Sequence, residues 1–242
     1  MIGKEPEPAG VGTEVNPPSW LDRFRVEAPS LTVPPFLSPP ESGARPAAVL
    51  ILFGEGPDGP DVLLIERAAH LSKHAGQPAF PGGGIDPGDD GPVGAALREA
   101  QEETGLDPAG VEVLVTLPEL YLGRSGYRIT PVAAWWREPS EVSAYDPGEV
   151  ASVARVPLAE LADPQNRLKV RHPVGLAGPA FKVRGSRFVA AGAPPRNAHM
   201  LVWGFTAGLL TQVLEVGGWD RSWDTARVED LPPEVLALAS RG

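Results

Sequence analysis

The stretch 84–106 reads GIDPGDDGPVGAALREAQEETGL and predicts an amphipathic helix. Its apolar residues recur at intervals of three and four, which is the spacing of one helix face. They are Val93, Ala96, Leu97 and Ala100. Start and stop signals agree, because Asp89 and Asp90 suit the N-cap, Pro92 suits the first turn and Gly105 suits the end. The rest of the chain is interpreted around this helix.

The same helix gathers acidic side chains. Glu99, Glu102 and Glu103 lie three and four positions apart, so they share a flank that is distinct from the apolar face. Like charges at this spacing repel by roughly 0.2–0.5 kcal/mol per pair on an isolated helix. A solvated acidic surface would tolerate this repulsion, and a bound dication would remove it. The preceding segment 80–84, FPGGG, favours the dication, because glycines let backbone oxygens approach a ligand. Carboxylate and carbonyl oxygens suit Mg²⁺ or Mn²⁺.

The spacing of these residues resembles the Nudix box, G-x5-E-x7-R-E-U-x-E-E-x-G-U, where U is apolar. The matching residues are Gly84, Arg98, Glu99, Ala100, Glu102, Glu103, Gly105 and Leu106. Asp90 stands where the pattern has glutamate. The resemblance implies an α+β fold, the Nudix α/β/α sandwich with a mixed β-sheet. It also implies a hydrolase that cleaves a diphosphate linkage with the help of Mg²⁺ or Mn²⁺.

The resemblance assigns roles to particular residues. The implied metal ligands are Glu99, Glu102, Glu103 and a carbonyl at Gly83. Glu99 is the candidate base or a ligand next to it, and Arg98 is expected to orient the glutamates through an ion pair. Many Nudix enzymes take an additional acid from a later loop, for which Glu149 or Glu141 is the candidate here.

The loop before the box carries the cations that an anionic substrate needs. They are Arg67, His70, Lys73 and His74. Arginine offers a bidentate fork to phosphate, and lysine offers a point charge. The alternative is that Arg67 and Lys73 pair with acids of the protein itself, including those of the box.

This loop resembles the signature of the coenzyme A diphosphatase branch of the family, L-L-T-x-R-(S/A)-x3-R-x3-G-x3-F-P-G-G. The matching residues are Leu63, Leu64, Arg67, Ala68, Gly76, Phe80, Pro81, Gly82 and Gly83. Ile65 and Ser72 depart from it. The implied substrate-binding residues are Arg67, Lys73, Gly76 and Phe80. The implied reaction cleaves coenzyme A or an acyl-coenzyme A to 3′,5′-ADP and 4′-phosphopantetheine.

Other functions stay open because Ser72 replaces an arginine of that signature. The chain can be a Nudix pyrophosphatase for NADH, ADP-ribose or a nucleoside triphosphate, or a non-catalytic Nudix-like binding module. In the pair Trp135 and Trp136, alternation along a strand places at least one ring in the core. The other is a candidate for stacking on an adenine.

Composition sets the domain organisation and excludes several classes of function. The chain has 242 residues, 28 Gly, 29 Pro, no Cys and a net charge of −10. We expect a disordered tail at 1–18, an extended arm with a short helix capped by Ser19 at 19–46, one hydrolase domain at 47–216 and an extension at 217–242. Without cysteine there is no disulfide or thiolate chemistry. An acidic chain has no general attraction to nucleic acid polymers or anionic membranes. We therefore expect a small-molecule diphosphate partner and a cytoplasmic location, with the oligomeric state open and a homodimer among the options.

Periodicity and turn signals predict the other elements. Apolar runs at 47–54 and 61–66 flank EGPDGP and predict a hairpin. Further strands are expected at 111–117, 127–136, 150–156, 168–170 and 187–189. Helices are expected at 19–26, 157–161, 201–216 and within the terminal PPEVLALAS. Strands on both sides of one helix, with a second helix later, predict a mixed sheet covered on two faces.

Overall fold

The computed structural model describes residues 16–40, 42–71, 74–123, 125–173, 177–188 and 199–239. The α-helices are α1 (Asp22–Glu27), α2 (Gly91–Thr104), α3 (Leu158–Ala162), α4 (Gly204–Gly217) and α5 (Pro233–Ala239). The strands are β1 (Arg45–Gly56), β2 (Gly59–Arg67), β3 (Pro78–Ala79), β4 (Gly82–Gly84), β5 (Val111–Thr116), β6 (Leu120–Leu122), β7 (Tyr127–Trp136), β8 (Val150–Pro157), β9 (Arg167–Arg171), β10 (Ala177–Arg184), β11 (His199–Val202) and β12 (Val228–Asp230). Short 3-10 helices are η1 (Ser19–Leu21), η2 (Ala28–Ser30), η3 (Pro35–Leu37), η4 (Pro108–Gly110), η5 (Pro164–Asn166) and η6 (Gly185–Arg187).

Two sheets make up the β-structure of the described residues. The larger has the order β3-β2-β1-β7-β5, with β4 on β1, β6 on β7 and β8 on β2. It is mixed, because β1 and β7 run parallel while its other pairs are antiparallel. The smaller has the order β11-β10-β9-β12. The predicted hairpin is confirmed, since β1 and β2 pair with Gly56 opposite Gly59.

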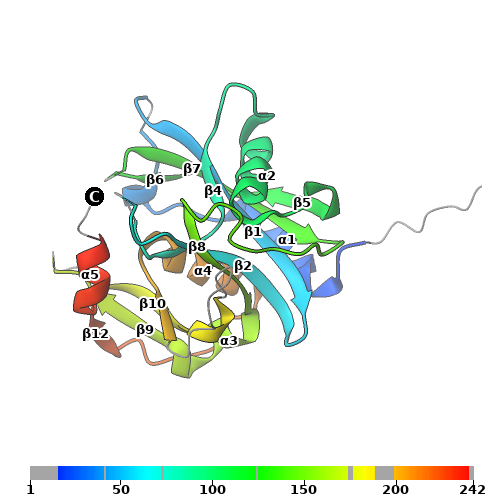
Figure 1. The fold of residues 1–242 in the computed structure, drawn as a ribbon. Coiled ribbons are helices and arrows are strands. Elements are labelled where there is room, and N and C mark those ends of the chain that lie inside the picture. Colours follow the sequence, from blue (N-terminus) through cyan, green and yellow to red (C-terminus); the bar gives the residue numbers. More distant parts are fainter. Residues whose placement is uncertain are drawn as a thin grey trace, which may run out of the picture.

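Helices cover both faces of the larger sheet, as the alternating side chains of β1 show. Leu50 and Leu52 pack in one core cluster with Ala96 of α2. Ile51 and Phe53 pack in another, with apolar residues of α4. The smaller sheet and α5 lie on the opposite side of the molecule from α2 (Figure 1). The predicted fold class, α+β with a mixed sheet between helices, is confirmed.

The N-terminal segment contributes to the core. Leu21 and Phe24 are fully buried, and the Phe24 ring stacks on Trp219 with 5.9 Å between centroids. The predicted helix near 19–26 is confirmed as η1 and α1, but Ser19 is not its cap. Pro18 takes that place without a side-chain hydrogen bond. The segment 29–46 is also not extended throughout, because the 3-10 turns η2 and η3 interrupt it.

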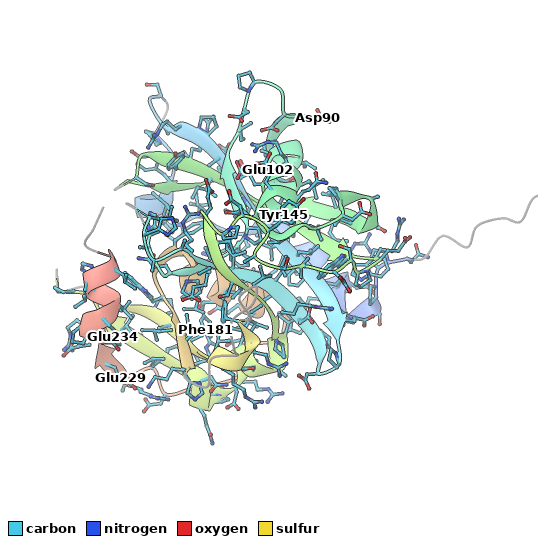
Figure 2. The ribbon with its side chains drawn as sticks, viewed as in Figure 1. Asp90, Glu102, Tyr145, Phe181, Glu229 and Glu234 are labelled. Carbon is cyan, nitrogen blue, oxygen red and sulfur yellow. The ribbon has the colours of Figure 1, made fainter. Side chains whose placement is uncertain are left out.

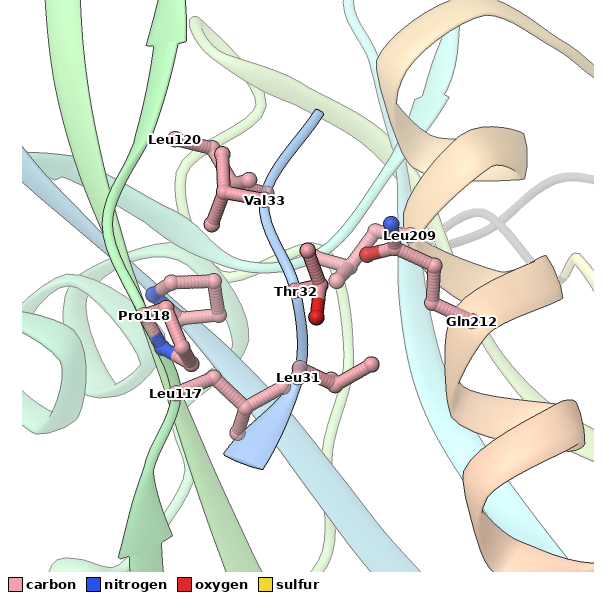
Figure 3. A pocket seen from close by; sticks show the side chains of 9 residues that line it. Leu31, Thr32, Val33, Leu117, Pro118, Leu120, Leu209 and Gln212 are labelled. Carbon is pink, nitrogen blue, oxygen red and sulfur yellow. The ribbon is translucent and has the colours of Figure 1, made fainter. Parts of the chain in front are cut away.

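An apolar pocket lies between this N-terminal segment and α4. Its walls come from Leu31, Thr32 and Val33 on one side and from Leu209 and Gln212 of α4 on another (Figure 3). Leu117 and Pro118, which follow β5, close it together with Leu120 of β6 and Pro131 of β7. It contains none of the predicted site residues, so we do not consider it the substrate site.

The second half of the chain shows where the sequence predictions were wrong. The helix expected from residue 201 begins at Gly204, and Leu201 belongs to β11. The positive φ of Gly204, +66°, ends the extended conformation of the strand. The strand expected at 187–189 is also wrong, since Arg187 ends η6 and Val189 lies outside the described residues. Strands β3, β4, β6, β10, β11 and β12 were not predicted. The predicted terminal helix is confirmed as α5, and β12 joins the smaller sheet.

No helix in the described part of the chain combines the length and the apolar character that crossing a bilayer requires.

Candidate active site

Helix α2 forms as the sequence predicts and presents its acids beside β4. Ala95, Ala96 and Ala100 are buried against the larger sheet. Asp90 is the N-cap residue but makes no side-chain cap hydrogen bond, and a proline occupies the first turn. Gly105 ends the helix in the left-handed conformation and its N–H donates to the carbonyl of Gln101 at 2.8 Å.

Glu103 is the most enclosed of the three glutamates, with 2% of its surface exposed. Its Oε2 accepts a hydrogen bond from the backbone N–H of Gly82 at 3.0 Å. Its Oε1 lies 3.7 Å from Nη1 of Arg67 and has no hydrogen-bond partner. Burial raises the pKa of Glu103 to about 8, against the opposing effects of the Gly82 N–H and Arg67. A second cation placed at Oε1 would hold this carboxylate ionised.

Glu99 lies against the backbone of β4. A Cβ built on Gly83 would collide with the carboxylate of Glu99, so only glycine allows this approach. Burial raises the pKa of Glu99, and the charges of Glu102 and Glu149 act in the same direction. The glycine segment is a strand paired with β1 rather than the loop that the sequence suggested, because Ala48 lies opposite Gly83 in the ladder.

Arg98 links the acids of the site. Its Nη1 donates to Glu99 at 3.1 Å and to Glu102 at 3.0 Å, and its Nη2 donates to the carbonyl of Gly84 at 3.0 Å. The rest of the guanidinium forms a bidentate pair with Asp89, at 2.8 and 3.1 Å. These bonds lower the pKa of Asp89 and raise that of Arg98 further above its usual range.

The bidentate role of Asp89 was missed by the sequence reasoning. The box pattern pointed to Asp90, which is exposed at the N-terminal end of α2, while Glu102 lies farther along the same helix (Figure 2). The sequence did carry a signal for this role, because two acids, Asp89 and Asp90, stand side by side before the helix. Arg98 can pair with only the one that faces it. Glu102 is the most exposed of the three glutamates Glu99, Glu102 and Glu103, with 60% of its side chain accessible.

The residues predicted to bind substrate lie in different environments. Arg67 is partly exposed beside Glu103, and the backbone N–H of Gly76 donates to the Arg67 carbonyl at 3.0 Å. Lys73 lies outside the described residues. Phe80 is buried in the core cluster on the α4 side, and its contact with substrate stays a prediction. Its apolar ring gains more from the core than from an aqueous site.

Two further predictions concern Glu149, in the loop before β8, and the tryptophans at the end of β7. The carbonyl of Glu149 accepts from the N–H of Ala68 at 2.8 Å, and the charge of Glu149 raises the pKa values of Glu99 and Glu103. Glu149 is therefore placed near the glutamates of α2. The expectation that one of Trp135 and Trp136 stacks on an adenine is wrong, because both are buried, in core clusters on opposite faces of the sheet.

The residues present fit a divalent cation. Their donors are carboxylate oxygens beside a glycine backbone, the ligand type that Mg²⁺ and Mn²⁺ prefer. The Oε1 of Glu103 has no hydrogen-bond partner, and burial together with neighbouring carboxylates raises the pKa values of Glu99 and Glu103; both observations indicate missing positive charge. No group of three His, Asp or Glu side chains in the described ranges is already arranged to hold a metal ion. Arg98 instead pairs with two of the glutamates.

Comparison with known proteins identifies the family. A family model described as the NUDIX domain matches residues 43–174. An uncharacterized Nudix hydrolase, NudL, from Cronobacter sakazakii is 38% identical over 205 residues, covering 84% of this chain and 97% of the relative. NudL from Escherichia fergusonii is 38% identical over 176 residues, covering 72% of this chain and 83% of the relative. The crystal structure of RenU, a Nudix hydrolase from M. smegmatis, aligns with a TM-score of 0.42 and 29% identity over 52% of this chain and 81% of RenU.

The family match and the two relatives agree with the box helix described above. The chain belongs to the Nudix family and is an enzyme of its pyrophosphohydrolase class.

Proposed function

We propose that the protein is a Mg²⁺- or Mn²⁺-dependent diphosphatase that acts on coenzyme A or an acyl-coenzyme A, with 3′,5′-ADP and 4′-phosphopantetheine as the products from coenzyme A. The observation that carries the reaction class is the enclosed Glu103, with one oxygen bound to a backbone N–H and the other unpartnered. What supports the substrate is the match of residues 63–83 to the signature of the coenzyme A branch.

The residues of the site suit the chemistry of a diphosphate. Glu99, Glu102 and Glu103, with the carbonyl of Gly83, would hold the dication. When bound, the dication supplies charge neutralisation and Lewis acidity to the diphosphate oxygens. Arg67 adds a fixed positive charge beside Glu103, where a phosphate oxygen would be stabilised.

Proton transfer is assigned to the same flank of α2. The raised pKa of Glu99 brings this carboxyl group closer to the range in which a general base works at neutral pH. Arg98 holds Glu99 and Glu102 in place, because its Nη1 forms an ion pair with each of them. Glu149 adds negative charge near Glu99 and Glu103 and is our candidate for the additional acid.

A substrate panel tests the proposal. Coenzyme A, dephospho-coenzyme A, NADH and ADP-ribose are each incubated with Mg²⁺ or Mn²⁺, and the products are identified by mass spectrometry. A Glu103→Gln variant purified in parallel controls for contaminating phosphodiesterases. We expect metal-dependent cleavage of coenzyme A in the wild type. Cleavage of NADH or ADP-ribose without cleavage of coenzyme A would contradict the substrate assignment. Binding of coenzyme A without turnover of any compound would contradict the enzymatic assignment.

A further inference from the structure

The C-terminal helix α5 is anchored to the smaller sheet. The preceding strand β12 runs parallel to β9, with Val228 opposite Lys169. Leu231 is buried, and Val235 and Leu236 pack with it against apolar residues of β9 and β10. The N–H of Leu236 donates to the carbonyl of Pro232 at 3.0 Å. The position of α5 is therefore fixed by contacts that do not involve the candidate active site.

Leu238 of α5 contacts a different part of the molecule. It lies two positions after Leu236, which places it on another face of the helix. A Cβ built on Gly76 would lie 2.7 Å from Cδ1 of Leu238, closer than real Cβ contacts come. Gly76 also has a φ of +65°, which favours glycine. Glycine at this position thus satisfies both the turn and the close contact with α5.

The turn at 74–77 is bonded to the backbone of Arg67. The N–H of Gly76 donates to the Arg67 carbonyl at 3.0 Å, and the N–H of Arg67 donates to the Gln77 carbonyl at 3.1 Å. Within the turn, the N–H of Gln77 donates to the carbonyl of His74 at 3.2 Å. The guanidinium of Arg67 in turn lies 3.7 Å from Glu103. Contacts therefore run without a gap from Leu238 through Gly76 to Arg67.

We infer that Leu238 is a positioning residue for substrate binding: α5 supports the 74–77 turn from outside the site and thereby holds Arg67 where a substrate phosphate would bind. The part of this inference that concerns substrate binding by Arg67 rests on the proposed function. The supporting contact itself does not depend on which diphosphate is cleaved. It assigns a role to the C-terminal extension, which lies outside the region that matches the family model.

A pair of leucine variants tests the inference. Leu238→Ala removes the contact with Gly76, whereas Leu236→Ala shortens a side chain on the same helix that packs on the smaller sheet. We expect Leu238→Ala to raise KM for coenzyme A by about threefold or more with little change in kcat, because substrate binding alone is weakened. Leu236→Ala is expected to lower the melting temperature and leave KM within about twofold of wild type.

Hydrogen exchange gives a readout that needs no substrate. The amides of Arg67, Gly76 and Gln77 are expected to exchange faster in Leu238→Ala than in Leu236→Ala. Equal exchange in the two variants would overturn the inference, even if the enzyme has no activity on the panel. If Leu238→Ala shows faster exchange but an unchanged KM in an active enzyme, the role of Leu238 in substrate binding is overturned.

Gly76→Ala provides a second test of the same contact, which does not depend on the activity of the Leu238 variant. In the wild-type background this substitution combines backbone strain with a collision against Leu238, and in the Leu238→Ala background only the strain remains. We expect a smaller loss of melting temperature from Gly76→Ala in the second background. Equal losses in both backgrounds would show that the contact with α5 has no energetic role.

Discussion

Arg67 and Glu103 face each other across the candidate site, with Nη1 of the arginine 3.7 Å from Oε1 of the glutamate. This distance is too long for a hydrogen bond, and Oε1 has no other partner. The other oxygen of Glu103 is held by the N–H of Gly82. The carboxylate is thus fixed at one oxygen and lacks a hydrogen bond at the other, which is the arrangement on which the proposed function depends.

Without metal, the free energy of unfolding should depend on the protonation of Glu103. Its folded-state pKa of about 8 lies above its ordinary value of 4.5, so the folded protein binds the proton more tightly than the unfolded chain does. Stability from this group is full below pH 4.5 and is lost as pH rises toward 8. The loss should be on the order of a few kcal/mol. Chemical denaturation with a chelator at pH 5 and pH 8 measures it, and Glu103→Gln should remove this part of the pH dependence. Equal losses in the two proteins would contradict the assignment.

Gly83→Ala should impair catalysis because its Cβ would displace the carboxylate of Glu99. Gly84→Ala is the matched control, since a Cβ at Gly84 meets nothing within 4 Å. We expect turnover to fall by about tenfold or more in Gly83→Ala and to change by less than about threefold in Gly84→Ala. Steady-state kinetics of both variants checks this. Similar turnover in the two would mean that the place of Glu99 against β4 is unimportant.

Asp89→Asn should reduce activity because it removes the charge that holds the guanidinium of Arg98. Asp90→Asn is the control, since Asp90 is exposed and makes no cap hydrogen bond. We expect kcat to fall by about fivefold or more in the first variant and to stay within about twofold in the second. The reverse order would show that the pattern of the box, rather than the observed ion pair, identifies the functional acid.

Phe24→Ala should destabilise the protein by about 3–5 kcal/mol, because Phe24 is fully buried against Phe53 and Trp219. Val26→Ala, two positions along the same helix, should cost less than about 0.5 kcal/mol, since Val26 is 73% exposed. Equilibrium denaturation of both variants gives the comparison. A loss below about 1 kcal/mol in Phe24→Ala would show that the N-terminal segment packs only loosely on the core.

The parts of the fold that local signals determine could be predicted from the sequence. The hairpin around residue 58 and strand β7 (Tyr127–Trp136) are formed by runs whose alternation and turns act over a few residues. Helix α2 carries its own start and stop signals. Its glutamates therefore share one flank in the structure as in the sequence.

What the sequence could not give depends on contacts between distant segments. The apolar run that begins at Leu201 continues into α4 in the sequence, and the change from strand to helix falls at the extended Trp203 and the positive φ of Gly204. The burial of Phe80 follows from the position of α4, to which no local pattern points. The choice of Asp89 over Asp90 by Arg98 depends on the path of the chain from β4 to α2.

Titration of the metal-free protein with Mn²⁺, followed by calorimetry, tests directly whether the glutamates of α2 bind a divalent cation. We expect a saturable site in the wild type and in Asp90→Asn, and binding weakened by at least about tenfold in Glu103→Gln. Equal Mn²⁺ affinity in Glu103→Gln and in the wild type would show that these glutamates do not form the metal site.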